Sequence, residues 1–256
     1  MLRAGFTKMV RSLGLGRRPG HQPDLIFDIG MHNGDDSAYY LGLGFRVVAV
    51  EANPVHVRAA RRRFKREIRA RRLTIVSLGI AATRGVLPFY VNPDIDVWSS
   101  FESSWAGRLP EQHLTTRLVR TITAEDLIER FGVPHYAKID VEGMDHIVVQ
   151  HLINCGARPR FISFELSFSQ PNLPTLEVLL AAAYSRFKIV SQVEVPNRLQ
   201  RAGHWPGGEW KFRFGSSGPF GDDADGEWLD AAQTRSMLTD LPDGFFNWHD
   251  LHAALA

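Results

Sequence analysis

Glycine and acidic residues around two apolar runs are the first residues in this sequence whose types and spacing suit ligand binding. In LIFDIGMHNGDDSAYYLGLGFRVVAVEANP (residues 25–54), Gly30 and Gly34 lie in a turn after the first run, and Glu51 ends the second. Glycines in such a turn let a ligand approach the backbone closely. An acid at the end of the next strand can accept hydrogen bonds from both hydroxyls of a ribose. The pattern therefore predicts a nucleoside-binding turn.

The spacing of the turn also indicates which nucleoside it suits. The glycines are spaced G-x-x-x-G, so the G-x-G-x-x-G fingerprint of dinucleotide binding is missing, which disfavours an NAD-dependent reductase. Asp35 and Asp36 follow at the start of a predicted helix, where they would repel a phosphate. An adenosine ligand without phosphates and with a positive centre fits better. We therefore predict S-adenosylmethionine, with Asp28 near its amino-acid end.

A second group of acids follows two later strands. Asp140 and Glu142 end the apolar run in AKIDVEGMD, and Glu165 holds the matching position in FISFEL. Neighbouring parallel strands end at one edge of a sheet, so the three carboxylates should converge on one crevice. Lys138 alone cannot neutralise them, and leaving them unpaired would be costly. We predict that these acids are catalytic: Asp140 or Glu142 orients or deprotonates the acceptor, and Glu165 assists. A divalent cation among these oxygens is an open alternative that the sequence does not predict.

The elements that position these residues alternate along the chain. Apolar runs predict strands at 24–29, 45–50, 73–81, 135–141 and 160–166, and helical patterns predict helices at 34–43, 54–70, 143–154 and 174–185. This alternation is typical of a parallel sheet with helices on both faces. Further strands are predicted at 85–92, 117–122, 187–193 and 209–214, and Thr123 with Asp126 predicts a capped helix over 124–131.

Composition narrows the class of protein. The 256 residues suit a single α/β domain over 21–256, and the net charge of +2 gives no general attraction to nucleic acid. The single cysteine, Cys155, excludes an internal disulfide and a cysteine-rich metal site. No apolar run approaches the roughly 20 residues that span a bilayer, so we expect a cytoplasmic protein. The basic segment 1–20 predicts a short amphipathic helix, which either packs on the domain or contacts a membrane surface.

The sequence allows two interpretations of the role of each of three segments. Residues 58–72 are strongly basic and read either as the solvated face of a helix or as a polynucleotide-binding helix; we favour the first, because no aromatic stacking platform accompanies the charge. The irregular segment 93–116, which contains Trp98 and Phe101, is either a substrate lid or a plug for the core. The loop-rich extension 215–256 either closes over a substrate or links a strand to the tail.

Five ordered motifs carry a resemblance to a known family. DIGMHNGDDSAYYL, VVAVEANP, VWSSF, RTITAEDLIERFG and KIDVEGMD together resemble the FkbM-type S-adenosylmethionine-dependent methyltransferases over about residues 24–166. The resemblance implies the class I methyltransferase fold, a doubly wound Rossmann-like sheet of seven strands with the last antiparallel. It also implies cofactor-binding positions at Asp28, Gly30, Met31, His32, Asn33, Gly34, Glu51, Ala52, Asn53, Ile80 and Asp140. The chain departs from many relatives at His32, where asparagine is common, and at Asp145, where glutamate is usual.

The same resemblance implies a reaction. It points to methyl transfer onto a hydroxyl of a small molecule, such as a glycoside or polyketide, with no nucleic-acid partner. Methylation of an amine or nucleic acid is the alternative among enzymes, but the asparagine-proline-proline-aromatic signature of many such enzymes is replaced by DVEG. A non-catalytic adenosine-binding protein is the alternative outside enzymes. The sequence names neither the acceptor nor the oligomeric state.

Overall fold

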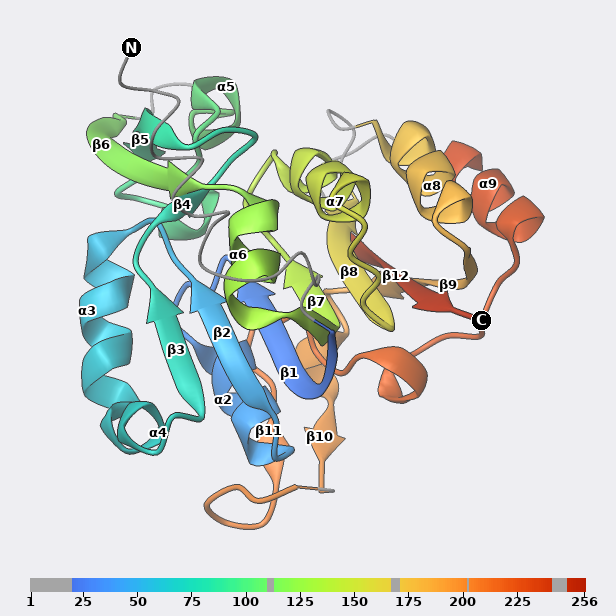
Figure 1. Ribbon diagram of the computed structural model, residues 1–256, viewed down its shortest axis with the longest axis horizontal. Coiled ribbons are helices and arrows are strands. Elements are labelled where there is room, and N and C mark those ends of the chain that lie inside the picture. Colours follow the sequence, from blue (N-terminus) through green and yellow to red (C-terminus); the bar gives the residue numbers. More distant parts are fainter. Residues whose placement is uncertain (1–19, 110–112, 167–170, 202, 241–247) are drawn as a thin grey trace, which may run out of the picture.

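The protein is described by a computed structural model that covers residues 20–109, 113–166, 171–201, 203–240 and 248–256. Seven strands form the main sheet, in the order β3-β2-β1-β7-β8-β12-β9 (Figure 1). Their bounds are β1 (His21–Ile29), β2 (Arg46–Val50), β3 (Leu73–Val76), β7 (Val133–Ile139), β8 (Phe161–Leu166), β9 (Tyr184–Ser191) and β12 (His249–Leu255). β12 runs antiparallel to both its neighbours, and the pairs from β3 to β8 are parallel. The predicted sheet is confirmed.

Alternation within β1 divides the core into two layers. Leu25, Phe27 and Ile29 pack against one set of helices, and Ile26 packs on the opposite face. The first face is covered by α6 (Ala124–Phe131), α7 (Asp145–Asn154), α8 (Asn172–Ala181) and α9 (Ala231–Asp240), which lie in front of the sheet in Figure 1. The opposite face is covered by α2 (Asp35–Gly42) and by aromatic side chains of the C-terminal region, Trp205, Phe212 and Phe220. None of the described helices is long and apolar enough to cross a membrane.

Local sequence explains several element boundaries. Thr123 and Asp126 form the predicted capping box, each side chain accepting a hydrogen bond from the other's backbone N–H. The predicted helix 54–70 is interrupted at Phe64, which leaves α3 (Pro54–Arg63) and α4 (Lys65–Arg69). Asn53 caps α3 by accepting from the Val55 N–H. The buried residues of α3 and its end are Val57, Ala60 and Phe64, whereas its arginines point outward, as expected of a solvated face.

Two strand predictions are only partly right. The predicted strand 73–81 breaks after Val76, and its end becomes β4 (Gly79–Ile80), which pairs with β6 (Thr115–Ile122) beside β5 (Gly85–Val91) in a separate sheet. The segment 209–214 supplies only β11 (Trp210–Lys211), paired with β10 (Leu199–Gln200). The antiparallel strand of the main sheet is instead β12, within the predicted extension. The sequence of β12 does not indicate a buried strand, because it contains the polar residues Asp250 and His252. Both are nevertheless buried.

The remaining elements are short. They are α5 (Ser103–Ala106) and the 3₁₀ turns η1 (Asp96–Trp98), η2 (Val195–Asn197) and η3 (Gly221–Asp223). Trp205 and Trp210 pack around Tyr39, with Trp205 stacked on its ring, so these tryptophans serve the core. The predicted N-terminal helix lies outside the described residues.

Candidate active site

A cavity of about 640 Å³ lies beyond the carboxyl ends of β1, β2, β7 and β8. Most of the residues that the sequence nominated line it: Gly30, Met31, His32, Asn33, Glu51, Ala52, Asn53, Ile80, Asp140, Glu142 and Glu165. Two nominated residues do not. Asp28 is fully buried behind the cavity wall, and Gly34 is the N-cap of α2 in a left-handed conformation. The fold therefore brings both predicted groups, the nucleoside turn and the acids, to one cavity.

The turn after β1 needs a glycine because another backbone segment crosses it. Gly30 has φ +86°, and a Cβ placed on it would lie 1.6 Å from the carbonyl oxygen of Asp140. The same contact is held by a hydrogen bond from the Asp140 N–H to the Ile29 carbonyl, at 2.9 Å. This close approach sets the separation between the nucleoside turn and the acids after β7.

We expect Gly30→Ala to destabilise the protein more than Gly44→Ala. Both glycines have positive φ, so each alanine brings a left-handed backbone cost of about 1–2 kcal/mol. Only Gly30 has a neighbour in the way, whereas nothing lies within 4 Å of a Cβ on Gly44. Overpacking should add about 1–3 kcal/mol at Gly30. Urea unfolding of the two variants measures the difference, and equal losses would contradict the close-approach argument.

Glu51 is held in place by its own neighbourhood. Its Oε2 accepts the His32 N–H at 2.8 Å and its Oε1 accepts the Asn53 N–H at 2.6 Å. Burial raises the pKa of this carboxyl to about 7, against the two backbone hydrogen bonds and Lys138, which lower it. Each carboxylate oxygen can accept a further hydrogen bond. Glu51 thus presents two oriented acceptors to the cavity, as binding a pair of neighbouring hydroxyls requires.

Part of the cavity wall is apolar. Leu78, Gly79 and Ile80 form one side of it, and Phe101 lies so close that a Cβ on Gly79 would be 2.2 Å from its ring. Phe101 also packs edge-on against Phe89, with ring centroids 5.0 Å apart. A flat heterocyclic base would find apolar contacts here, which agrees with the predicted role of Ile80. Phe101 thus lines the cavity and packs against the buried ring of Phe89.

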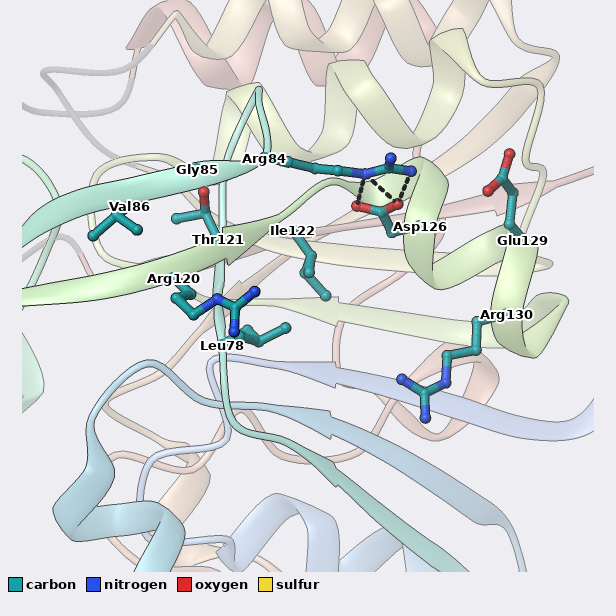
Figure 2. A pocket seen from close by; sticks show the side chains of 10 residues that line it. All are labelled: Leu78, Arg84, Gly85, Val86, Arg120, Thr121, Ile122, Asp126, Glu129 and Arg130. Atoms are coloured by element: carbon teal, nitrogen blue, oxygen red, sulfur yellow. Dashed lines mark hydrogen bonds and ion pairs between the residues drawn. The ribbon is translucent and has the colours of Figure 1, made fainter. Parts of the chain in front are cut away.

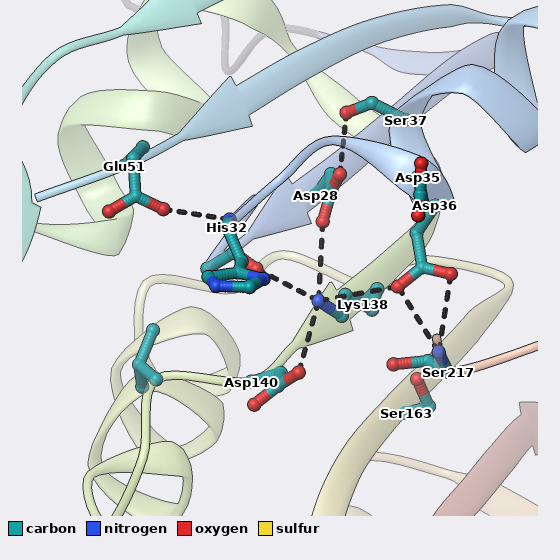
Figure 3. A network of polar contacts seen from close by, with 12 residues as sticks. Asp28, His32, Asp35, Asp36, Ser37, Glu51, Lys138, Asp140, Ser163 and Ser217 are labelled. Carbon is teal, nitrogen blue, oxygen red and sulfur yellow. Dashed lines mark hydrogen bonds and ion pairs between the residues drawn. The ribbon is translucent and has the colours of Figure 1, made fainter. Parts of the chain in front are cut away.

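A buried lysine, which the sequence interpretation undervalued, joins the two groups (Figure 3). The Lys138 ammonium donates to the Gly30 carbonyl at 2.9 Å and lies 3.2 Å from Asp140, 3.5 Å from Asp28 and 3.7 Å from Asp36. Burial works to lower the pKa of Lys138, but attraction to the three aspartates raises it well above its ordinary value. A lysine inside an otherwise apolar parallel strand was the signal in the sequence, because such a charge must be paired.

The aspartates of this network are anchored by other groups as well. Asp28 accepts a hydrogen bond from the Ser37 hydroxyl, at 2.5 Å. Asp36 accepts the Ser217 N–H at 3.1 and 3.2 Å and thereby ties the 215–223 loop to α2. Burial raises the pKa of Asp28, although the charge of Lys138 works to lower it. Burial likewise raises the pKa of Asp36 to about 7. Lys138 therefore fixes the start of α2 and the end of β7 around one ammonium group.

The three predicted catalytic acids meet at the opposite end of the cavity. One oxygen from each of Asp140, Glu142 and Glu165 lies within 4.8 Å of the other two. The chain is not extended there, because Glu142 has φ +52°, so the turn rather than strand alternation brings the first two together. Burial, then the charge of Asp140, raises the pKa of Glu142 to about 8. Burial, then Glu142, raises that of Glu165 well above its ordinary value, and Glu165 Oε2 has no hydrogen-bond partner among the described residues.

Side chains of the predicted lid segment, 93–116, hold Glu142. The Trp105 indole N–H donates to Glu142 Oε2 at 2.6 Å, and Arg108 lies 3.6 Å from the same oxygen. The Arg108 guanidinium lies over the rings of Trp98, at 3.9 Å, and Trp105, at 4.3 Å. The Ser100 hydroxyl donates to the Glu142 carbonyl at 2.6 Å. The predicted lid segment thus covers the acids and supplies an aromatic wall.

A larger hollow of about 920 Å³ lies elsewhere, between β5, β6 and α6 (Figure 2). Its charged lining includes Arg84, which pairs with Asp126 through hydrogen bonds of 2.8 and 3.0 Å. Leu78 is the one residue that it shares with the cavity at the strand ends. None of the residues nominated from the sequence as site residues lines this hollow. We therefore place the candidate site at the strand ends.

Several methyltransferases of known structure are similar to this chain. A precorrin-6y C5,15-methyltransferase from Geobacter metallireducens is 13% identical with a TM-score of 0.38, covering 98% of this chain and 86% of its own. The human methyltransferase 10 domain containing protein is 13% identical with a TM-score of 0.34, covering 74% of this chain and 73% of its own. The N-terminal domain of human METTL16 is 12% identical with a TM-score of 0.36. The match covers 73% of this chain and 63% of the METTL16 chain.

Family membership rests on a match over about two thirds of the sequence. No curated protein matches the chain significantly. Residues 28–194, however, match the family described as the methyltransferase FkbM domain. This range begins at Asp28, just before the nucleoside turn, and includes β2, all three acids of the cavity and the lid segment. The chain therefore belongs to the FkbM methyltransferase family.

Proposed function

We propose that this protein is an S-adenosylmethionine-dependent O-methyltransferase whose acceptor is a hydroxyl group of a small sugar-like or secondary-metabolite-like molecule. One observation carries the proposal. Glu51 and Asp140 follow β2 and β7, which flank β1 on its two sides, and both line the cavity beyond the strand ends. In doubly wound sheets, this crevice is where ligands bind.

The lining fits the cofactor at each of its parts. Glu51 offers two oriented oxygens for the ribose hydroxyls, and the apolar lining around Ile80 and Phe101 offers contact to adenine. Asp36 and Asp140 also line the cavity, and their negative charge suits the ammonium and sulfonium groups of the cofactor. When bound, S-adenosylmethionine supplies a methyl carbon activated by a sulfonium. The protein then mainly has to position the acceptor.

The acids explain why a hydroxyl acceptor is favoured. An alcohol must lose its proton as it is methylated, and a positioned carboxylate can accept it. Glu142 suits this role, because its pKa of about 8 lies near neutral pH and Trp105 fixes one of its oxygens. Asp140 can orient the same hydroxyl, and Glu165 can accept a second hydrogen bond from the acceptor. Trp98 and Trp105, which hold Arg108 between them, add apolar surface to the cavity lining against which a ring could pack.

Replacement of Glu51 tests cofactor binding directly. We expect Glu51→Gln to weaken S-adenosylmethionine binding about 10- to 100-fold, because hydrogen bonds to a charged acceptor contribute about 1.5–3 kcal/mol each. A glutamine would also present an N–H₂ group to one of the two backbone N–H donors that Glu51 now accepts. Isothermal titration measures the change. Glu125→Gln, on the exposed side of α6, is the matched control and should bind like the unchanged protein.

The titration also separates the alternatives. A protein that binds NAD⁺ but not S-adenosylmethionine would contradict the cofactor assignment. Cofactor binding without transfer of a labelled methyl group to any acceptor would favour the non-catalytic interpretation. A panel of glycosides, polyketide-like phenols, amines and RNA then tests the acceptor class, and transfer to amines or RNA alone would overturn the O-methylation proposal.

A further inference from the structure

A second group of metal-ligating side chains lines the cavity on the nucleoside side. His32 lies in the turn after β1, His56 in the first turn of α3, and Asp96 at the start of η1. The Nε2 atoms of both histidines lie 3.4 Å from the same carboxylate oxygen, Asp96 Oδ2. Ligand atoms of all three lie within 4.8 Å of one another. Three segments that are distant in sequence thus direct imidazole and carboxylate groups at one point.

The two histidine–aspartate separations match those between neighbouring ligands of a tetrahedral metal ion. Zn–N bonds are about 2.0–2.1 Å and Zn–O bonds about 2.0–2.2 Å, so neighbouring ligand atoms in a tetrahedral site lie about 3.3–3.5 Å apart. A direct hydrogen bond between imidazole and carboxylate would be shorter, at about 2.7–2.9 Å. Consistently, His32 Nε2 is buried and has no hydrogen-bond partner among the described residues. The 3.4 Å contacts therefore leave room for an ion between the groups.

We propose that His32, His56 and Asp96 bind a divalent transition-metal ion of the Zn²⁺ type. Imidazole nitrogens with one carboxylate suit zinc and its neighbours, whereas the all-carboxylate group of Asp140, Glu142 and Glu165 would suit hard cations. Three protein ligands leave a fourth position for water or for a group in the cavity. The Asp96 side chain is 54% exposed, so the ion can enter from solvent.

The ion would join the lid to the nucleoside turn. Asp96 belongs to the same 3₁₀ turn as Trp98, which lies against Arg108 above the acids. The backbone N–H of His32 holds Glu51, so one residue would connect the metal to the ribose-binding acid. Bound metal should therefore hold the lid closed over the cavity, and its removal should loosen residues 93–101 without unfolding the sheet.

Cobalt substitution tests the site without relying on activity. The chelator-treated full-length protein should bind one Co²⁺ or one Zn²⁺ per chain, and bound Co²⁺ should show the intense visible bands of tetrahedral coordination. His56→Gln and Asp96→Asn should each weaken binding at least about 10- to 100-fold, the loss typical of disturbing even an outer-shell partner. His113→Gln, an exposed histidine outside the cluster, is the matched control and should bind normally.

Hydrogen exchange supplies a second readout. Zn²⁺ should slow exchange over residues 93–101 in the unchanged protein and in His113→Gln, but not in His56→Gln. Circular dichroism shows whether each variant keeps its fold, and Asp96→Asn, at an exposed position, provides an independent test if His56→Gln does not fold. The proposal is overturned if no metal binds, or if binding persists in both folded variants with the weak spectrum of octahedral Co²⁺, which would place the ion at the acids instead.

Discussion

Lys138→Met is expected to destabilise the folded protein by about 3–5 kcal/mol, the usual cost of removing one partner from a buried ionic group. The substitution leaves Asp28 and Asp36 buried without their cation, and removes the hydrogen bond to the Gly30 carbonyl. Domains are commonly stable by only about 5–15 kcal/mol, so the variant should unfold at much lower urea concentration or fail to accumulate. Urea unfolding followed by tryptophan fluorescence measures the loss.

A second buried lysine provides the matched control. Lys188 is also buried, but its ammonium donates to the backbone carbonyls of Ala224 and Asp222 rather than to carboxylates. Lys188→Met therefore leaves two backbone carbonyls without a hydrogen-bond donor, but no buried acid without its counter-ion. It should lower the free energy of unfolding by about 1–3 kcal/mol. Equal losses in the two variants would contradict the view that Lys138 acts chiefly as a counter-ion.

The pH dependence of the Lys138→Met loss follows from the same network. Without the ammonium, the pKa values of Asp28 and Asp36 should rise further, because burial already raises both and Lys138 opposes that rise. Protonation then relieves the buried charge. The destabilisation should therefore be smallest below the pKa of about 7 given for Asp36 and should grow as the pH rises above it toward the higher pKa of the variant. A loss that is constant with pH would indicate a packing defect instead.

Glu142→Gln is expected to lower kcat/KM for a hydroxyl acceptor about 10²- to 10⁴-fold, the range for loss of a general base. In the unchanged enzyme, only the ionised form of Glu142 can accept the proton, so kcat/KM should rise with pH through about 8 and then level off. The variant should lose this rise. Steady-state kinetics across pH, with an acceptor from the panel, give both readouts.

Controls separate loss of the base from loss of structure. Glu142→Gln should still bind S-adenosylmethionine, since the predicted ribose and adenine contacts lie at the other end of the cavity. Folding raises the pKa of Glu142 from 4.5 to about 8, so its ionisation destabilises the fold as pH rises through that interval, and the glutamine variant escapes this loss. Glu102→Gln, an exposed acid in the same lid segment, should keep full turnover. Full turnover in Glu142→Gln would exclude it as the base.

The sequence by itself determined which residues face the cavity. Gly30, Glu51 and Asp140 could be placed because each follows a strongly apolar strand, and Glu165 because it lies at the end of another; the carboxyl ends of parallel strands must meet at one edge. The prediction depends only on local pattern and on one rule of topology. It was less successful for Asp28, whose side chain is fully buried and pairs with Lys138 instead of lining the cavity.

The tertiary structure decided how those residues are held. Lys138 reaches the Gly30 carbonyl across 108 positions of sequence, and the Ser217 N–H reaches Asp36 across 181. Trp105 and Arg108 meet Glu142, and Asp96 meets two histidines, through an irregular segment whose path no periodic pattern reveals. The polar residues of β12 likewise do not indicate a buried strand, and only its pairing with β8 and β9 buries it. Strand ends follow from local periodicity, whereas the partners of a buried charge depend on side chains that only the folded chain brings together.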